Sequence, residues 1–597
     1  MENKIRNLAI IAHVDHGKTT LVDKLFRESG TIKNITEENE RLMDSNAIEK
    51  ERGITILAKN TGINYKDYKI NIVDTPGHAD FGGEVERTLQ MVEGFLLLVD
   101  AAEGVLPGTR FVLGKALDLN LKPIVVINKI DRPDADIHKT EEEIHDLFLD
   151  LAKDESHLEF PILYGSGKLG FVGTDPNATS GSMGPLLEEI IKTIPAPKVR
   201  SEPFQMLITN LSHSEFLGPI AIGRVLGGSI KVGQSFVVCK DNYVSKPMKI
   251  TKIFGFLGLD KIEQEETKSG DIVAVTGFTE EATIGSTLCH TDKVVPAPYI
   301  KVDEPTLSVY LSVNNSPFNG KEGSLLTSRQ IRERLEKELK TNVALRVEDT
   351  DSPEIFKLSG RGQLHLSILF ENMRREGFEF QVSAPEVIYK QIDGKKCEPI
   401  ELVIVDVPAE YQGAVVENLG RRKGIMHNMH PHANGRIRIE FLVPSRCLLG
   451  FRSQFLTDTR GNGLLNVSLK GYEAYKGDFV VRTKGALVSM EPGVTTAYAL
   501  DNLKARGILF VEPGQQIYQG LIIGEHSRDN DLDVNPCKGK KLTNMRASGS
   551  DDAVQLPPVK KMDLETCMEW IRPDELIEIT PKSIRLRKKV LNPSFRK

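Results

Sequence analysis

The segment "AHVDHGKTT", Ala12 to Thr20, constrains the fold of this chain more than any other feature. It matches the pattern G-x-x-x-x-G-K-[ST], with Ala12 in place of the first glycine. It follows the apolar run "LAIIA" and precedes the helix-like sequence "TTLVDKLF". In such a strand–loop–helix unit, the backbone N–H groups of the loop and of the helix N-terminus face phosphate oxygens. The sequence therefore predicts an α/β domain that binds a nucleotide beyond the end of its first strand.

The residues of this loop have separate expected roles. Gly17 lets the backbone come close to the phosphates, Lys18 neutralises the β- and γ-phosphates, and Thr19 places its hydroxyl on Mg²⁺. The candidate nucleotide-binding residues of the loop are Asp15, His16, Gly17, Lys18, Thr19 and Thr20.

A second phosphate-side motif is "NIVDTPGHADF", which follows another apolar strand. We expect Asp74 to hold Mg²⁺ through a water and the Gly77 N–H to meet the γ-phosphate. Thr55, in "RGIT", is the second expected hydroxyl ligand of Mg²⁺, in place only while the γ-phosphate holds it. His78 stands where many small GTP hydrolases have a glutamine that orients water, so it is the candidate catalytic residue.

The base side of the predicted site is formed by "NKID" at the end of the strand "PIVVI". Its residues are Asn128, Lys129, Ile130 and Asp131. The Asp131 carboxylate can accept hydrogen bonds from N1–H and the amino group of guanine. Adenine offers no such donor pair, so the site should discriminate strongly against it. The loop "GSGK", with Ser166 and Gly167, follows "PILY" and is expected to contact the base through its backbone.

Changes of pattern along the chain predict an α/β multidomain protein. Alternating strands and helices give way to short glycine-punctuated strands, then to two mixed segments. The expected domains are a P-loop GTPase domain (1–198), a β-barrel (199–300), two ferredoxin-like α+β domains (301–392 and 393–482) and a mixed, β-rich C-terminal domain (483–597).

Charge, cysteines and histidines narrow the other possibilities. A net charge of -6 argues against a generic polyanion binder, but residues 535–597 hold 14 Lys+Arg against 8 Asp+Glu, which favours a local anionic partner; a solvated charged face is the alternative.

The six cysteines show no framework spacing and fit a reducing cytosol. No apolar run approaches a membrane span and a motif begins near the first residue, so we expect a cytoplasmic protein without signal peptide. His427, His430 and His432 lack a zinc-site spacing, and we interpret them as part of a polar loop.

Together these motifs resemble those of the translational GTPases, in order and spacing. The segment "GRVLGGSIKVGQ" resembles their second domain, and "SGRGQLHLSILFENMRREGFEFQVSAPEVIY" resembles the third domain of elongation factor G. "PIELVIVDVPAEYQGAVVENLGRRKGIM" resembles its fifth domain. Between the last two, "YKQIDGKKCEPIEL" leaves about ten residues, too few for the further domain of elongation factor G. Two families lack that domain, LepA (elongation factor 4) and BipA, also called TypA. "MDSNAIEKERGITIL" and "GKKLTNMRAS" resemble BipA, whereas "GSGK" departs from the usual serine-alanine-leucine.

The resemblance implies a GTPase that binds GTP or GDP with Mg²⁺ and acts on the ribosome, regulating translation or large-subunit assembly under stress. The implied partners are the 70S ribosome or the large subunit, 23S rRNA including the sarcin–ricin loop, and tRNA, with a monomer when free and no membrane. The sarcin–ricin loop would draw His78 inward. The candidate RNA contacts are Lys538, Lys540, Lys541, Asn544 and Arg546. A LepA-like elongation factor and a GTP-dependent assembly scaffold with incidental hydrolysis are the alternatives.

Overall fold

The computed structural model describes most of the chain, and the chain divides into two compact units. The described residues are 4–13, 15–31, 47–52, 55, 58–76, 82–200, 203–214, 216–240, 243–279, 282–298, 304–342, 344–431, 435–539 and 556–596. The units are Met1–Asp303 with Lys340–Val343, and Glu304–Leu339 with Ala344–Lys597. Gly77, His78, His432, Lys540, Lys541, Asn544 and Arg546 lie outside the described residues.

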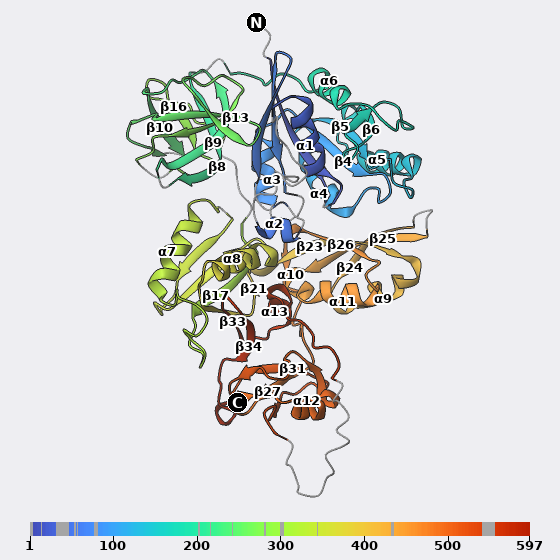
Figure 1. Ribbon diagram of the computed structural model, residues 1–597, viewed down its shortest axis with the longest axis vertical. Helices are drawn as coiled ribbons and strands as arrows, with labels where there is room; N and C mark the ends of the chain where they lie inside the picture. The colour runs from blue at the N-terminus through green and yellow to red at the C-terminus, as the bar shows by residue number, and fades with distance from the viewer. Residues whose placement is uncertain are drawn as a thin grey trace, which may run out of the picture. The chain divides into compact units, whose positions relative to one another are not determined.

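The first unit begins with a mainly parallel sheet in the order β2-β3-β1-β4-β5-β6-β7 (Figure 1). Its strands are β1 (Ile5–Ala12), β2 (Lys59–Tyr65), β3 (Tyr68–Asp74), β4 (Gly94–Asp100), β5 (Lys122–Asn128), β6 (Ile162–Ser166) and β7 (Phe171–Gly173). The pairs β3–β1, β1–β4, β4–β5 and β5–β6 are parallel, whereas β2 and β7 add antiparallel edges. The expected α/β domain is confirmed.

Both faces of this sheet are covered, which explains why its strands are apolar at almost every position. Leu8 and Ile10 pack on one face with α1 and α6, and Ala9 and Ile11 pack on the other with α3, α4 and α5. The helices are α1 (Lys18–Glu28), α2 (Ala47–Arg52), α3 (Gly82–Leu89), α4 (Pro107–Asp118), α5 (Ile137–Leu151) and α6 (Gly184–Thr193). The carboxyl ends of the parallel strands therefore meet at one edge, where the nucleotide motifs lie.

The second part of the first unit is the expected β-barrel, built from antiparallel pairs in the order β11-β10-β16-β8-β9-β15-β13-β14. Its strands are β8 (Gln205–Ser214), β9 (Gly218–Gly227), β10 (Ser235–Lys240), β11 (Tyr243–Val244), β12 (Met248–Lys249), β13 (Lys252–Leu257), β14 (Asp260–Gln264), β15 (Ile272–Thr276) and β16 (Thr287–His290). A buried polar contact joins it to the sheet: the Asp271 carboxylate accepts hydrogen bonds from Lys69 Nζ at 2.7 Å and from Asn71 Nδ2 at 3.0 Å.

The second unit contains two α+β folds with the same topology, as expected. In the first the strand order is β18-β19-β17-β20, and in the second it is β24-β25-β23-β26. The first comprises β17 (Leu307–Val313), α7 (Ser328–Leu339), β18 (Arg346–Asp349), β19 (Ile355–Gly360), α8 (Gln363–Arg375) and β20 (Phe380–Ser383). The second comprises β23 (Lys395–Pro408), α9 (Gln412–Arg421), β24 (Ile425–Pro431), β25 (Arg436–Pro444), α11 (Phe451–Asp458) and β26 (Leu464–Ala474). Each has the βαββαβ order of a ferredoxin-like fold.

One expectation about the second of these folds is wrong. His427 and His430 were expected in a polar loop, but both lie in β24, an exposed edge strand. Pairing with β25 holds this polar segment extended, with a bulge between Met426 and Asn428. Tertiary pairing therefore overrides the weak strand propensity of its histidines and asparagine.

The C-terminal region, expected at 483–597, forms a sheet of its own and also adds two strands to the first α+β fold. Its first part forms a sheet in the order β29-β31-β27-β32, beside α12 (Ala497–Leu503) and the pair β28–β30. These strands are β27 (Ala486–Ser489), β28 (Gly493–Val494), β29 (Gly507–Leu509), β30 (Gln516–Ile517), β31 (Ile522–His526) and β32 (Leu532–Val534). The chain then returns through α13 (Leu564–Trp570) to β33 (Glu575–Ile579) and β34 (Ile584–Lys588), which extend the sheet of the first α+β fold beyond β20.

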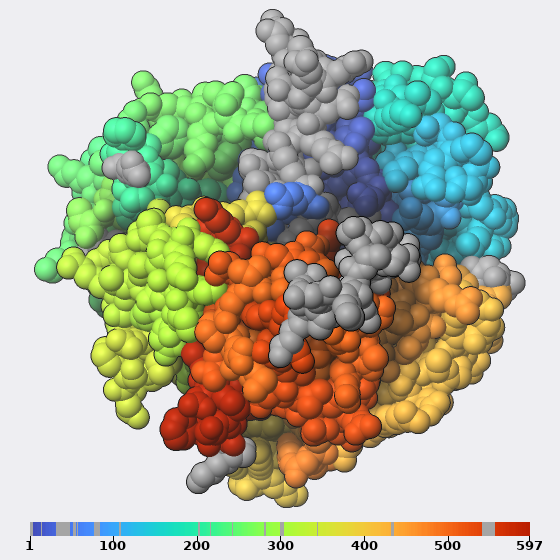
Figure 2. Space-filling model, turned by 60° about the horizontal axis from the view of Figure 1, so that its bottom comes forward, coloured from blue at the N-terminus to red at the C-terminus, as the bar shows by residue number. Residues whose placement is uncertain are grey.

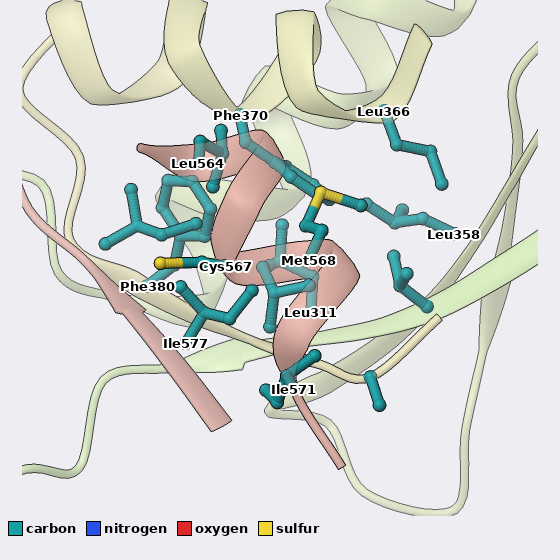
Figure 3. Packing of buried hydrophobic residues seen from close by; sticks show 14 of the residues in the cluster. Leu311, Leu358, Leu366, Phe370, Phe380, Leu564, Cys567, Met568, Ile571 and Ile577 are labelled. Carbon is teal, nitrogen blue, oxygen red and sulfur yellow. The ribbon is translucent and has the colours of Figure 1, made fainter. Parts of the chain in front are cut away.

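This return places C-terminal residues in the core of the first α+β fold. Figure 3 shows Cys567, Met568 and Ile577 among Leu311 and Phe370. The two regions also lie side by side in Figure 2, where they are red and yellow-green. The domain boundaries stay a proposal, but residues 304–390 and 564–588 share one sheet and one core.

Among the described residues, no helix is both long enough and apolar enough to cross a membrane.

Candidate nucleotide-binding site

The phosphate loop turns sharply between β1 and α1. Gly17 precedes the helix with a φ of 93°, and Asp15 also has a positive φ, 64°. A Cβ atom on Gly17 would lie 2.5 Å from Nδ2 of Asn128, so the position requires glycine for both its backbone conformation and its close approach. The Asp15 side chain is exposed. The loop therefore has the tight left-handed turn that brings backbone N–H groups to one side.

Lys18, the first residue of α1, brings three of the expected phosphate-side residues together. Its Nζ lies 2.6 Å from Oδ1 of Asp74 and donates to Oγ1 of Thr55 at 2.7 Å. It also donates to the backbone carbonyl of Thr75 at 3.2 Å. Asp74 ends β3 in the next parallel strand, so sheet register places its carboxylate beside the phosphate loop. Three motifs far apart in sequence thus converge on one ammonium group.

Burial shapes the charge of this cluster. Removal from water raises the pKa of the Asp74 carboxyl, and the nearby Lys18 ammonium opposes that rise. A buried carboxylate and two threonine hydroxyls are hard oxygen donors, which suits Mg²⁺. Thr55 and Asp74 meet at Lys18, while Thr19 follows it on α1 and is half-buried, and Thr20 is exposed. The residues present therefore fit Mg²⁺, and its ligand set stays a prediction.

Asn128 ties the base-side loops to the phosphate loop. Its Nδ2 donates to the backbone carbonyl of His16 at 2.8 Å, and its Oδ1 accepts from the N–H of Gly167, also at 2.8 Å. The N–H of Ile130 donates to the carbonyl of Gly165 at 3.3 Å. One amide thereby fixes the distance between the phosphate loop and the loop after β6. The expected grouping of these motifs at one sheet edge is what the structure shows.

Lys129 and Asp131, which follow Asn128, have different surroundings. Lys129 has a positive φ of 60°, and its Nζ lies 2.7 Å from Oδ2 of Asp100 at the end of β4. Asp131 is exposed, as a group that receives a ligand must be before binding. Ser166 is buried, and its Oγ accepts from the N–H of Leu169 at 3.1 Å, so its side chain closes the turn rather than facing a ligand.

Asp100 is a residue that the sequence motifs missed. Burial would raise the pKa of its carboxyl, but hydrogen bonds from Lys129 and from the Ala102 N–H hold that pKa below its ordinary value. Its position at the end of the apolar strand "FLLLV", on the ligand edge of a parallel sheet, is the signal that could have found it.

His16 contributes to the loop through its backbone. Its imidazole is fully buried, with Nδ1 3.3 Å from the carbonyl oxygen of Leu98 and Nε2 3.7 Å from the Glu103 carboxylate. Burial and the neighbouring His13 lower the pKa of His16 to about 4. The ring is therefore a neutral support beneath the loop, and its carbonyl is the group that Asn128 holds.

Outside this edge, the described residues hold a carboxylate cluster that resembles a metal site. Asp531, Asp574 and Glu575 converge, but Lys588 Nζ lies 2.5, 2.7 and 2.8 Å from their oxygens, so an ammonium already balances the charge. Among the candidate RNA contacts, Lys538 is exposed, and its carbonyl accepts from Oγ1 of Thr496 at 2.7 Å.

Comparison with known families matches the chain segment by segment. The model of the elongation factor Tu GTP binding domain matches residues 3–196, and that of elongation factor Tu domain 2 matches 218–289. The elongation factor G C-terminus matches 395–482, and the TypA/BipA C-terminal domain matches 484–593.

Curated relatives extend the likeness to the whole chain. The chain is 52% identical to the "large ribosomal subunit assembly factor BipA" of Bacillus subtilis (strain 168), over 100% of this chain and 98% of that protein. It is 51% identical to the protein of that name from Synechocystis sp., over 98% of each. It is 52% identical to that of Escherichia coli (strain K12), over 100% and 98%. A crystal structure from Thermus thermophilus shares the fold, with a TM-score of 0.55 and 17% identity over 79% of this chain and 97% of that one.

Proposed function

The chain belongs to the TypA/BipA family of GTP-hydrolysing proteins, and from this premise we propose that it is a ribosome-associated GTPase that acts in assembly of the large ribosomal subunit. The observation that carries the proposal is the convergence of Asp74 and Thr55 on Lys18, because it sets two switch-side motifs against the phosphate loop. The name of the relatives favours subunit assembly over the other roles that the sequence leaves open. The match of residues 484–593 favours this family over LepA.

The residues of the site divide the work of hydrolysis. The backbone of the phosphate loop and Lys18 bind and neutralise the phosphates of GTP, and Asp131 accepts hydrogen bonds from guanine. Thr19, Thr55 and Asp74 would hold Mg²⁺, which supplies charge stabilisation at the β- and γ-phosphates when bound. Asn128 keeps the base and phosphate sides at a fixed distance, so that one ligand can meet both.

His78 is the proposed catalytic residue, although it lies outside the described residues. Its ordinary pKa near 6.5 makes it a weak base, so its contribution is to orient the attacking water. Phosphoryl transfer depends mainly on positioning and charge stabilisation. We propose that a phosphate of the sarcin–ricin loop of 23S rRNA moves this side chain into place, so that hydrolysis is fast only on the ribosome.

The proposed partners follow from the same assignment. Lys538 and the neighbouring basic residues would contact phosphates and unpaired bases of RNA, including the end of a bound tRNA. The protein is proposed to be a monomer when free and to act in the cytoplasm, where the proposed ribosomal partner is assembled.

GTP turnover with and without ribosomal particles tests the proposal. We expect stimulation of the wild-type protein by 70S ribosomes or isolated large subunits. His78→Ala should bind GTP normally and lose stimulated turnover by about 10²-fold, the scale for a positioned catalytic group. Equal turnover with and without particles would contradict the ribosome-associated role. Full stimulation of His78→Ala would show instead that the histidine is structural.

A further inference from the structure

A buried ion pair beside the candidate site belongs to none of the nucleotide motifs. Glu49 lies in α2, and its side chain is only 1% exposed. Its Oε2 lies 2.6 Å from Nζ of Lys59, the first residue of β2. Burying a carboxylate costs several kcal/mol unless a partner and hydrogen bonds compensate. Neither a short helix nor an edge strand requires a buried carboxylate to fold, so the position of Glu49 suggests another role.

The register of the sheet connects this pair to the site. Lys59 is the cross-strand partner of Asp74 in the antiparallel pairing of β2 with β3. Asp74 in turn meets Lys18 at 2.6 Å. Charges therefore alternate along the line Glu49, Lys59, Asp74, Lys18, and opposite charges on facing strand positions attract each other.

The same pair brackets Thr55 in the chain. Glu49 and Lys59 are ten residues apart, with Thr55 between them, and Oγ1 of Thr55 accepts from Lys18 Nζ at 2.7 Å. Joining two points on either side of a residue reduces the conformations open to it and the entropy lost when it is ordered. Lys18 therefore contacts Thr55, which lies between Glu49 and Lys59 in the chain, and also Asp74, the strand partner of Lys59.

We propose that the Glu49–Lys59 ion pair is a positioning device that holds Thr55 and Asp74 together for the GTP-bound state. The pair touches neither nucleotide nor reacting atoms; it acts through Thr55 and Asp74. The inference rests on the proposed role of Thr55 as a ligand that is engaged only when a γ-phosphate is present. Loss of the pair should therefore weaken GTP binding selectively and leave GDP binding unchanged.

The test compares Glu49→Gln with a control of matched burial in the same unit. Asp271 is 2% exposed and pairs with Lys69 at 2.7 Å, whereas Glu49 is 1% exposed and pairs at 2.6 Å. Asp271→Asn should thus cost similar stability without touching Thr55. Affinities for GDP and for a non-hydrolysable GTP analogue are measured on the full-length proteins, together with the Mg²⁺ dependence of GTP turnover.

For Glu49→Gln we expect affinity for the GTP analogue to fall about 10-fold, within the effect of one charged hydrogen bond. The Mg²⁺ concentration for half-maximal turnover should rise, and GDP affinity should change less than about 2-fold. Asp271→Asn should keep the wild-type ratio of GTP-analogue to GDP affinity. An unchanged ratio in Glu49→Gln, or an equal change in Asp271→Asn, overturns the inference.

Two further variants separate the possible failures. If Thr55→Ala loses GTP preference while Glu49→Gln keeps it, the positioning role of the ion pair is wrong and the role of Thr55 stands. If Thr55→Ala also keeps the preference for GTP, the positioning role of the ion pair and the role of Thr55 are both wrong. GDP binding reports whether Glu49→Gln is folded. If Glu49→Gln does not bind GDP, the double variant Glu49→Gln with Lys59→Met is measured instead, because it removes both charges at once. An equal loss of affinity for GDP and for the GTP analogue in the double variant would show that the pair is purely structural.

Discussion

Substitution of Leu311 by alanine should destabilise the distant C-terminal region as strongly as it destabilises its own strand. Leu311, on β17, and Ile577, on β33, are both fully buried (Figure 3). Both pair with Val382 of β20. They therefore belong to one sheet and one core, although 266 positions separate their numbers in the sequence. A cavity made in either strand should therefore lower the stability of the whole shared core.

The expected magnitude follows from the atoms removed. Leu311→Ala and Ile577→Ala each delete three buried carbons, which is roughly 2.4 kcal/mol of transfer free energy at about 0.8 kcal/mol per methylene. The cavity left behind raises this to about 3–4 kcal/mol. Domains have total stabilities of about 5–15 kcal/mol, so either loss is a large fraction of the total.

The chain carries its own reporter for this measurement. Trp570 is the single tryptophan; its indole N–H donates to Glu525 at 2.8 Å, and its ring lies 5.3 Å from that of Phe510. In urea titrations followed by Trp570 fluorescence, both variants should lower the midpoint by about 1–4 M, given typical slopes of about 1–3 kcal/mol per M. Leu339→Ala, at an exposed position on α7, should change stability by less than about 0.5 kcal/mol.

The refuting outcome is specific. If Leu311→Ala leaves the Trp570 midpoint at its wild-type value while circular dichroism detects a separate, earlier transition, residues 304–390 unfold independently of the C-terminal strands. The shared core would then not behave as one cooperative unit.

Three further predictions concern the site and its partners. Asp131→Asn should lower GTP affinity and raise affinity for xanthosine triphosphate in a competition assay; an unchanged preference would remove Asp131 from the base site. The pKa of His16 is lowered to about 4 in the folded protein, so between pH 6.5 and 4 only the unfolded chain takes up this proton. The free energy of unfolding should therefore decrease by up to about 3 kcal/mol as the pH is lowered through this range. His16→Gln should flatten that part of the pH profile of thermal melting. Combining Lys540→Ala, Lys541→Ala and Arg546→Ala should leave GTP binding intact but weaken ribosome binding, making its log–log salt dependence shallower by up to about 3; wild-type affinity at every salt concentration would indicate a solvated loop.

The residues whose place in the fold sequence analysis could predict are those whose chemistry is local. Gly17 and Lys18 lie where the phosphate loop meets α1, a turn whose backbone geometry is encoded within a few residues, and Asn128 ends a strand whose apolar character marks it as central. Parallel sheets bring such strand ends to one edge, so the convergence of these motifs follows from topology.

What sequence analysis missed depends on register or on distant pairing. Asp100 and Glu49 carry no motif, and only the structure shows that they face Lys129 and Lys59. The segment of Ile577 forms β33, but nothing in its residues indicates that β20 is its partner. A period of two specifies which face is buried, not which strand lies alongside.

The pairing of β20 with β33 also sets a schedule for the nascent chain. β20 ends at Ser383 and β33 begins at Glu575, so 192 positions separate the two numbers. At about 5–20 residues per second, synthesis of that interval takes roughly 10–40 s. During this time β20 is an edge strand with unpaired backbone groups, the kind of edge that invites pairing with another chain. Folding of residues 304–390 can therefore be completed only after nearly the whole polypeptide has left the ribosome that makes it.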